Sequence, residues 1–258
     1  MLTLLMYSGS ISSQIKNARY QLIFSDEFNL PDFSRPDTTV WSVPPQNTNV
    51  RWRRWISNLP EVAYIKNGKL VLRAIPNKEK GSNGDSMLTG ALWSRGKFSF
   101  QYGRVEVRMR TNLKQGNSPA VWMGVDTYEP VPYAEIDIVE CFDDRGEAEH
   151  NVHTHQTITL KKKGTRNHFS EKLKVNRWHI YGLQWTKDSI IWTVDGKNVG
   201  TYARSYDPKQ IMEGQWTFDK KFFILMNQSL GDGQAGKHPN TKEIYETQID
   251  WVRIYQIE

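Results

Sequence analysis

The chain has 258 residues but only one cysteine, Cys141, and no apolar run as long as a membrane helix. A single cysteine excludes an internal disulfide framework and every zinc finger built from several cysteines. A membrane helix needs about 18 or more consecutive apolar residues, so no membrane span is predicted. The sequence also has no Pro/Ser/Gly-rich linker, low-complexity segment or fixed-period repeat. We therefore predict a single domain over residues 19–258.

The first residues resemble the end of a signal peptide. Residues 1–7 are mostly apolar and residues 8–13 are mostly small. The basic segment that opens a signal peptide is missing. We interpret residues 1–18 as the remnant of a signal peptide or an N-terminal tail. We expect an exported protein of bacterial type, located in the periplasm, at the cell surface or outside the cell.

Positive charge prevails, since 34 lysines and arginines outnumber 28 aspartates and glutamates, giving a formal net charge of +6. Such a charge suits an acidic partner, which could be a sulfated or carboxylated polysaccharide, a nucleic acid or an anionic surface. Part of the charge is clustered, because residues 51–55 read Arg-Trp-Arg-Arg-Trp. This segment is a candidate binding surface.

Amphipathic helices are also scarce: no long window repeats its apolar residues every 3.6 positions, and a short turn over residues 207–212 is the best helical candidate. Alternating, β-rich runs recur instead, separated by turn dipeptides such as Asn67-Gly68 and Asp195-Gly196. They predict an all-β sandwich. Its strands are expected near residues 20–24, 62–65, 69–75, 97–100, 103–110, 120–124, 134–140, 153–160, 178–185, 189–194, 221–227 and 247–255. Ten tryptophans and eleven tyrosines exceed what such a core needs, and they favour an aromatic groove that holds sugar rings.

The most informative segment is residues 135–140, Glu-Ile-Asp-Ile-Val-Glu. Side chains of a strand alternate between two faces, so Glu135 and Asp137 share one face while the isoleucines point into the core. Glu140 has the wrong parity for that shared face. One extra residue near Val139, a β-bulge, would bring all three carboxylates to one surface.

Three clustered carboxylates repel one another, and the segment has no cation between them. A solvated strand face is the simpler interpretation of any one of these acids, but a cluster of this kind usually serves a function. Retaining glycosidases hold two carboxyl groups about 5–5.5 Å apart. One attacks the anomeric carbon, and the other protonates the leaving oxygen and then activates water. A third carboxylate can push their pKa values apart, so the segment predicts a glycosidase site.

In this setting the motif resembles glycoside hydrolase family 16, which contains laminarinases, agarases, porphyranases and related endo-glycanases. The resemblance covers nearly the whole chain. Residues 25–28 resemble the family's opening strand, residues 97–108 the strand pair before the site, residues 119–123 the strand beside the catalytic one, and residues 249–255 the closing strand. It implies a jelly-roll (concanavalin-like) sandwich of two curved antiparallel sheets, with the substrate cleft on the concave face.

The resemblance also implies an endo-acting enzyme that retains the anomeric configuration. In it, Glu135 is the nucleophile, Asp137 the orienting carboxylate and Glu140 the general acid/base. No organic cofactor is required, and we expect a monomer. The polymer that it cuts is β-linked.

Further site residues follow from the same resemblance. Trp122 matches a tryptophan at the cleft floor, with a core position as the alternative. His153 matches a histidine of the family's next strand and His155 shares its parity; a neutral imidazole donating toward the nucleophile fits the chemistry, and zinc is the less favoured alternative because no third ligand is evident. Family members often bind one structural calcium ion. Its candidate ligands are Glu27 and Asp250, with ordinary surface acids as the alternative.

The substrate is less well defined by the sequence. Laminarinases carry different residues at segment 51–57, and a tryptophan in the glycine loop that here reads Gly-Asp-Gly-Gln-Ala-Gly over residues 231–236. Segment 52–57 looks more like family members that cut β-galactosidic bonds in host O-glycans or algal galactans. Trp52, Arg54 and Trp55 could bind a sulfated galactan by sulfate pairing and ring stacking, or the arginines could pair with acidic loops.

We predict an endo-β-galactanase that acts on porphyran, agar-type galactan or host poly-N-acetyllactosamine. The alternative within the class is an endo-β-1,3-(1,3-1,4)-glucanase of the laminarinase type. A non-catalytic lectin would also explain the aromatic residues, but it has no need of three intact carboxylates. A nucleic-acid partner is not expected, because an acidic cluster in the groove would repel phosphates.

Overall fold

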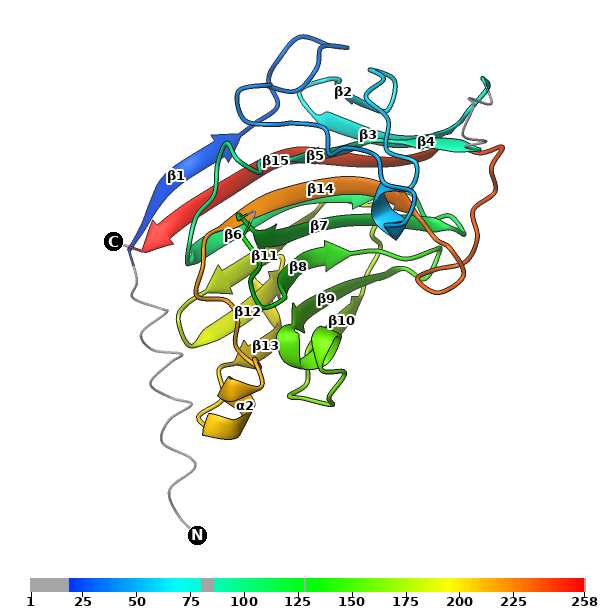
Figure 1. Cartoon of the computed structure of the whole chain (residues 1–258). Coiled ribbons are helices and arrows are strands. Elements are labelled where there is room, and N and C mark those ends of the chain that lie inside the picture. The colour runs from blue at the N-terminus through cyan, green and yellow to red at the C-terminus, as the bar shows by residue number, and fades with distance from the viewer. Residues whose placement is uncertain (1–18, 80–85, 128, 258) are drawn as a thin grey trace.

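The computed structural model describes residues 19–79, 86–127 and 129–257, which form two antiparallel β-sheets packed face to face (Figure 1). The predicted remnant of a signal peptide lies outside the described residues. Among the described helices, none is long and apolar enough to cross a membrane. The all-β jelly-roll sandwich is confirmed.

The larger sheet has nine strands in the order β13-β12-β11-β6-β15-β3-β2, with β1 paired to β15 and β4 to β3. Its strands are β1 (Tyr20–Asp26), β2 (Ala63–Ile65), β3 (Leu70–Pro76), β4 (Met87–Thr89), β6 (Gly103–Thr111), β11 (His179–Trp185), β12 (Ser189–Val194), β13 (Lys197–Ala203) and β15 (Tyr245–Ile257).

The smaller sheet has six strands in the order β10-β9-β8-β7-β14-β5. These are β5 (Ala91–Trp93), β7 (Asn117–Val125), β8 (Ala134–Glu140), β9 (Glu147–Thr154), β10 (His168–Lys172) and β14 (Phe222–Leu230). The carboxylate motif occupies β8, so its polar face lies on the side of this sheet that faces away from the core.

The core fills the space between the sheets, and alternation along the strands supplies it. On β6, for example, Val105, Val107 and Met109 are fully buried, while the residues between them are partly exposed. Large aromatic side chains complete this core, among them Trp185 of β11 and Trp192 of β12. Part of the tryptophan content therefore stabilises the core. The excess aromatic residues had instead been predicted to line a groove.

Local structure departs from the predictions at several places. The strand expected over residues 153–160 ends at Thr154, where a π-helical turn, η2 (His155–Thr159), begins. Thr154 and Thr157 cap this turn reciprocally through their hydroxyl and backbone groups, which competes with strand pairing. The expected strand 97–100 contributes only an isolated bridge between Phe100 and Phe222. Strands β4, β5, β10 and β13 were not predicted.

Two short helical elements complete the fold. The predicted turn near residues 207–212 is confirmed as α2 (Pro208–Met212), which Asp207 caps at its N-terminus. A 3₁₀ turn, η1 (Arg51–Arg53), lies beside β14 (Figure 1). This turn brings the Arg-Trp segment to the face of the smaller sheet.

Candidate active site

The predicted bulge exists on β8, one residue earlier than expected. Val139 lies opposite Val121 of β7 and Asp137 lies opposite Trp122, so Ile138 has no partner on β7. Ile138 and Val139 are both fully buried, although they are consecutive. This double inward step corrects the parity of Glu140, which lines the same groove as Glu135 and Asp137.

Buried side chains hold the bulge in place. On β9, His150 stands opposite two residues of β8, because Asp137 pairs with Asn151 and Glu140 pairs with Glu149. Burial lowers the pKa of His150 to about 4, so its imidazole is neutral, and its Nδ1 lies 2.6 Å from the carbonyl oxygen of Ile138. Trp192 of the opposite sheet donates from Nε1 to the carbonyl oxygen of Asp137 at 2.8 Å. The backbone of the catalytic segment is therefore anchored in the core.

A groove crosses the outer face of the smaller sheet over β7, β8 and β14. Trp122 lies in it, as predicted, and Trp52 of η1 meets Trp122 edge to face, with ring centroids 5.1 Å apart. Trp122 donates from Nε1 to the Oδ1 atom of Asn227 at 2.7 Å. The groove is lined by Arg51, Trp52, Ser118, Ala120, Trp122, Glu135, Asp137, Glu140, Asn227 and Ser229.

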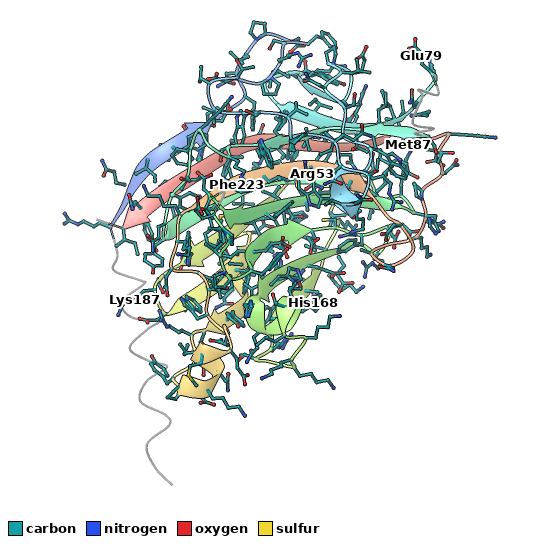
Figure 2. The ribbon with its side chains drawn as sticks, viewed as in Figure 1. Arg53, Glu79, Met87, His168, Lys187 and Phe223 are labelled. Carbon is teal, nitrogen blue, oxygen red and sulfur yellow. The ribbon has the colours of Figure 1, made fainter. Side chains whose placement is uncertain are left out.

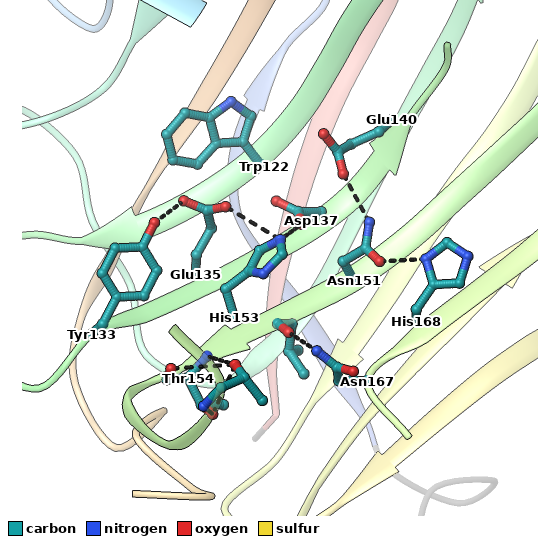
Figure 3. Close-up of polar contacts among 12 residues, drawn as sticks. Trp122, Tyr133, Glu135, Asp137, Glu140, Asn151, His153, Thr154, Asn167 and His168 are labelled. Atoms are coloured by element: carbon teal, nitrogen blue, oxygen red, sulfur yellow. Dashed lines mark hydrogen bonds and ion pairs between the residues drawn. The ribbon is translucent and has the colours of Figure 1, made fainter. Parts of the chain in front are cut away.

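His153 bridges two of the carboxylates (Figure 3). Its Nε2 atom lies 3.2 Å from Oδ2 of Asp137 and 3.7 Å from Oε1 of Glu135. Burial alone would lower the pKa of His153, but the hydrogen bond and charge of Asp137 outweigh it and raise the pKa to about 9. His153 is therefore an imidazolium near neutral pH, and the expectation of a neutral imidazole was wrong.

The pKa values of the outer two glutamates are both raised. For Glu135, burial is the largest cause and the charge of Asp137 the second, and together they raise the pKa to about 7. The charge of His153 and a hydrogen bond from the Tyr133 hydroxyl to Oε2 at 2.8 Å act in the opposite direction. Burial and the charges of Asp137 and Glu135 raise the pKa of Glu140 to about 8. Contacts from His153 and Tyr133 favour the ionised form of Glu135, whereas Glu140 accepts one hydrogen bond, from Asn151.

Three residues of the predicted site lie elsewhere. His155 opens η2 and packs against Gly214, so it does not share a strand face with His153. Arg54 is exposed, with its guanidinium 5.9 Å from the ring centroid of Trp55. Trp55 itself packs on a small apolar cluster formed by Ala74, Met87, Leu230 and Tyr245. For Arg54 and Trp55, the preceding 3₁₀ turn η1 is the reason, because it directs consecutive side chains to different sides.

The site also contains Arg51, from the predicted binding segment 51–55, and two residues that were not predicted, Tyr133 and Asn151. Arg51 lines the groove and donates to the carbonyl oxygen of Ala235 at 3.4 Å, which links η1 to the glycine loop. Tyr133 contacts Glu135, and Asn151 donates from Nδ2 to Oε2 of Glu140 at 2.8 Å. Asn151 shares its strand parity with His153, and that was the one signal in the sequence that could have indicated it.

One group of residues at the groove has the spacing of metal ligands. Among the described residues, one group, Glu135, Asp137 and His153, places three potential ligand atoms within 4.8 Å of one another. His153 pairs with both carboxylates of this group, and we interpret the three residues as part of the proton chemistry of the site.

The predicted calcium ligands, Glu27 and Asp250, each pair with an arginine. Glu27 accepts two hydrogen bonds from Arg253 at 2.8 and 2.9 Å. Asp250 pairs with Arg108 and, at 3.5 Å, with Lys69. Both carboxylates are thus paired with cationic side chains, and the structural calcium ion stays a prediction that the structure does not test.

A jelly-roll sandwich with paired carboxylates in a tryptophan-lined groove points to the glycosidase class. The comparisons agree: residues 54–253 match the family described as Glycosyl hydrolases family 16. The chain belongs to glycoside hydrolase family 16. The predicted family and enzyme class, hydrolases of O-glycosyl bonds, are thereby confirmed.

Relatives within the family carry different names. A keratan-sulfate endo-1,4-β-galactosidase of Sphingobacterium multivorum is 31% identical over 95% of this chain and 57% of that protein. A β-glucanase of Rhodothermus marinus is 30% identical over 93% of this chain and 87% of that protein. The chain thus spans little more than half the length of the first relative.

Similar solved structures likewise include a glucanase and a structure described with O-glycanases. A non-specific endo-β-1,3(4)-glucanase superposes with a TM-score of 0.79 at 25% identity, covering 93% of this chain and 92% of that one. A structure described with endo-acting O-glycanases that prominent human gut bacteria express to initiate mucin breakdown has a TM-score of 0.78 at 26% identity, covering 92% of this chain and 100% of that one.

Proposed function

We propose that the protein is a retaining endo-β-glycoside hydrolase that cleaves internal bonds of a β-linked polysaccharide. The bulge on β8 carries this proposal, because it places Glu135 and Glu140 on one side of the groove with Asp137 between them. Retention requires two carboxyl groups that face each other across a sugar ring with only a short gap. An acidic strand that merely faced solvent would not need the contacts of His150 and Trp192 with the backbone carbonyl groups of the bulge.

We assign the roles from the contacts of the two glutamates, because His153 and Tyr133 both favour the ionised form of Glu135. Glu135, as the carboxylate, attacks the anomeric carbon while Glu140 gives its proton to the leaving glycosidic oxygen, so that a glycosyl ester on Glu135 and a free hydroxyl result. Glu140, now ionised, removes a proton from water, which attacks the anomeric carbon and displaces the Glu135 carboxylate. His153 favours the ionised Glu135 through its charge, and Tyr133 donates to the same carboxylate. Trp122 and Trp52 offer aromatic faces for sugar rings.

For the substrate we propose a β-galactan, of the porphyran or agar type or the poly-N-acetyllactosamine of host O-glycans. Two observations support it: the relative named as an endo-β-galactosidase, and the placement of Arg51 beside Trp52 in the groove. A guanidinium next to a stacking surface suits a sulfated sugar. Such polymers lie outside cells, so we also propose that the protein is exported, and that it acts as a monomer.

The second candidate substrate is a β-1,3- or mixed-linkage β-glucan. The β-glucanase relative and the glucanase structure favour it. A glucan carries no sulfate, so Arg51 would then have a neutral partner or only its contact with Ala235.

The experiment is chromatography of oligosaccharides released from porphyran, agarose, keratan sulfate, mucin O-glycans, laminarin and mixed-linkage glucan. Wild type is compared with Glu135→Gln and Arg51→Ala. We expect a ladder of oligosaccharides from a galactan with wild type and none with Glu135→Gln. Arg51→Ala should lose part of the activity, and this loss should be larger on a sulfated polymer than on the neutral ones. Cleavage of laminarin alone would move the assignment to the glucanase. Binding without cleavage by the wild type would replace the enzyme with a lectin.

A further inference from the structure

The side chain of Glu140 is held through a chain of contacts that leads to the edge of the sheet (Figure 3). Asn151 of β9 donates from Nδ2 to Oε2 of Glu140 at 2.8 Å. Its other end, Oδ1, lies 2.7 Å from Nδ1 of His168. Strand pairing sets this arrangement, because His168 lies directly opposite Asn151 in the β10–β9 ladder. His168 does not line the groove, and its side chain is 55% exposed (Figure 2).

The amide of Asn151 has one accepting and one donating end, so its orientation matters. An amide oxygen only accepts, and the Nδ1 atom of His168 that faces it must therefore carry a hydrogen. With this donor in place, rotation of the amide by 180° would bring N–H groups of both residues together. His168 thus fixes which end of Asn151 faces Glu140.

We propose that His168 is a positioning residue which acts through Asn151, keeps Oε2 of Glu140 occupied as an acceptor, and leaves Oε1 to carry the acid proton. This proposal rests on the proposed role of Glu140 as the acid/base. Without His168, a rotated Asn151 would present its oxygen to Glu140 and accept the acid proton itself. The proton would then point at β9 and not at the glycosidic oxygen.

The charged groups around Glu140 give the sign of the expected pH effect. Asp137 and Glu135 on its own strand raise its pKa, and His153 on β9 lowers it. Glu149, its register partner on β9, is paired with Arg145 at 2.9 Å and lies 3.8 Å from Nδ1 of His168.

The remaining neighbours of Glu140 are uncharged except for one arginine. On the β7 and β14 side the groove presents Ser118, Ala120, Asn227 and Ser229, and η1 adds Arg51. A donor to a carboxylate lowers its pKa, so loss of His168, which loosens the Asn151 donor, should raise the pKa of Glu140. No other group around Glu140 would compensate for this loss.

The test compares His168→Ala, His168→Gln and Asn151→Ala with a matched control, His179→Ala. His179 makes a histidine–carboxylate contact of the same 2.7 Å length, with Asp195, on the larger sheet away from the groove. Kinetics use the panel polysaccharide that wild type degrades. We expect kcat to fall about tenfold in His168→Ala with KM nearly unchanged, and further in Asn151→Ala. The basic limb of the pH profile should rise by about half a pH unit, and His168→Gln, whose amide can still donate, should recover most of the rate.

Two further readouts separate the possible failures. The loss in His168→Ala should shrink on an aryl glycoside with a good leaving group, because such a group needs little help from an acid. Carbon-13 NMR titration of labelled glutamate, assigned with Glu140→Gln, follows the pKa of Glu140 without any substrate. If wild type cleaves nothing, the proposed function fails, yet an upward pKa shift in His168→Ala still supports the positioning role. An unmoved pH profile and titration, or equal loss in His179→Ala, would overturn it.

Discussion

Two residues of the same type in the groove are distinguished by the side chains that contact them. Glu135 and Glu140 are both glutamates on one strand, yet their surroundings differ: Glu135 faces His153 and Tyr133, whereas Glu140 receives only the amide of Asn151. Their parity and the motif could be predicted from the sequence. The contact of Tyr133 could not be predicted, and parity with His153 was the one hint for Asn151, because such contacts depend on side-chain direction and on the register between β8 and β9.

The roles of Glu135 and Glu140 predict a bell-shaped pH profile of kcat/KM. Activity needs Glu135 ionised, so kcat/KM should rise with pH through about 7. It also needs Glu140 protonated, so kcat/KM should fall as pH passes about 8. The measurement is the pH profile of kcat/KM for wild type, with Tyr133→Phe as a partner variant. Removing the Tyr133 donor should move the acidic limb to higher pH and leave the basic limb in place; a flat profile from pH 5 to 10 would contradict these roles.

A second prediction concerns stability at alkaline pH. The pKa of Glu140 is about 8 in the folded protein and near its ordinary value of 4.5 when the chain is unfolded. The folded state therefore binds more protons between these values, and its free energy of unfolding falls as pH rises through this window. Glu140→Gln, which cannot ionise, should melt higher than wild type at pH 9 but not at pH 4.5. We expect a gain of about 2–4 °C, which corresponds to roughly 1 kcal/mol for a chain of this size.

Calorimetry of both proteins at the two pH values provides the check. Glu171→Gln is the matched control, because Glu171 is an exposed glutamate of β10, a strand of the same sheet that is separated from β8 by β9. It should change the melting temperature little at either pH. Equal gains for both variants would show that net charge, and not the buried carboxyl of Glu140, is responsible.

At the scale of the element, the bulge on β8 decides the site. An unbroken alternation would turn Glu140 into the core, and the extra residue Ile138 prevents this. The sequence indicated a bulge because the motif needs one, but its place was set by packing. Ile138 and Val139 both fill the core, and Nδ1 of His150 lies 2.6 Å from the carbonyl oxygen of Ile138. The neighbouring strand was predicted less well, because the threonine caps that end β9 lie within a β-rich run.

Deletion of Ile138 tests this element. The shortened strand would present Glu140 to the wrong face, so activity should drop to the level of Glu140→Ala. Ile138→Ala keeps the register and only truncates a buried side chain. It should cost about 2–5 kcal/mol of stability while keeping kcat within about tenfold of wild type. Activity retained by the deletion variant would show that the bulge is not required.

At the scale of the whole molecule, the sandwich brings together segments far apart in the chain. The groove combines η1, β7, β8 and β14, and Arg51 reaches the loop that follows β14. Long alternating runs were enough to predict the two sheets. The three-residue strands β4 and β5 were missed because they are too short to show a period, and the true place of Trp55 was missed because apolar packing on Tyr245 is a tertiary contact.

The measurement that tests the account most directly is the stereochemistry of hydrolysis. Proton NMR would record the anomeric signal of the first product formed from the panel polysaccharide that wild type cleaves, before mutarotation. The account predicts that the β-anomer appears first, because Glu135 and Glu140 act in two successive displacements. An α-anomer as the first product would contradict the assignment of Glu135 as nucleophile.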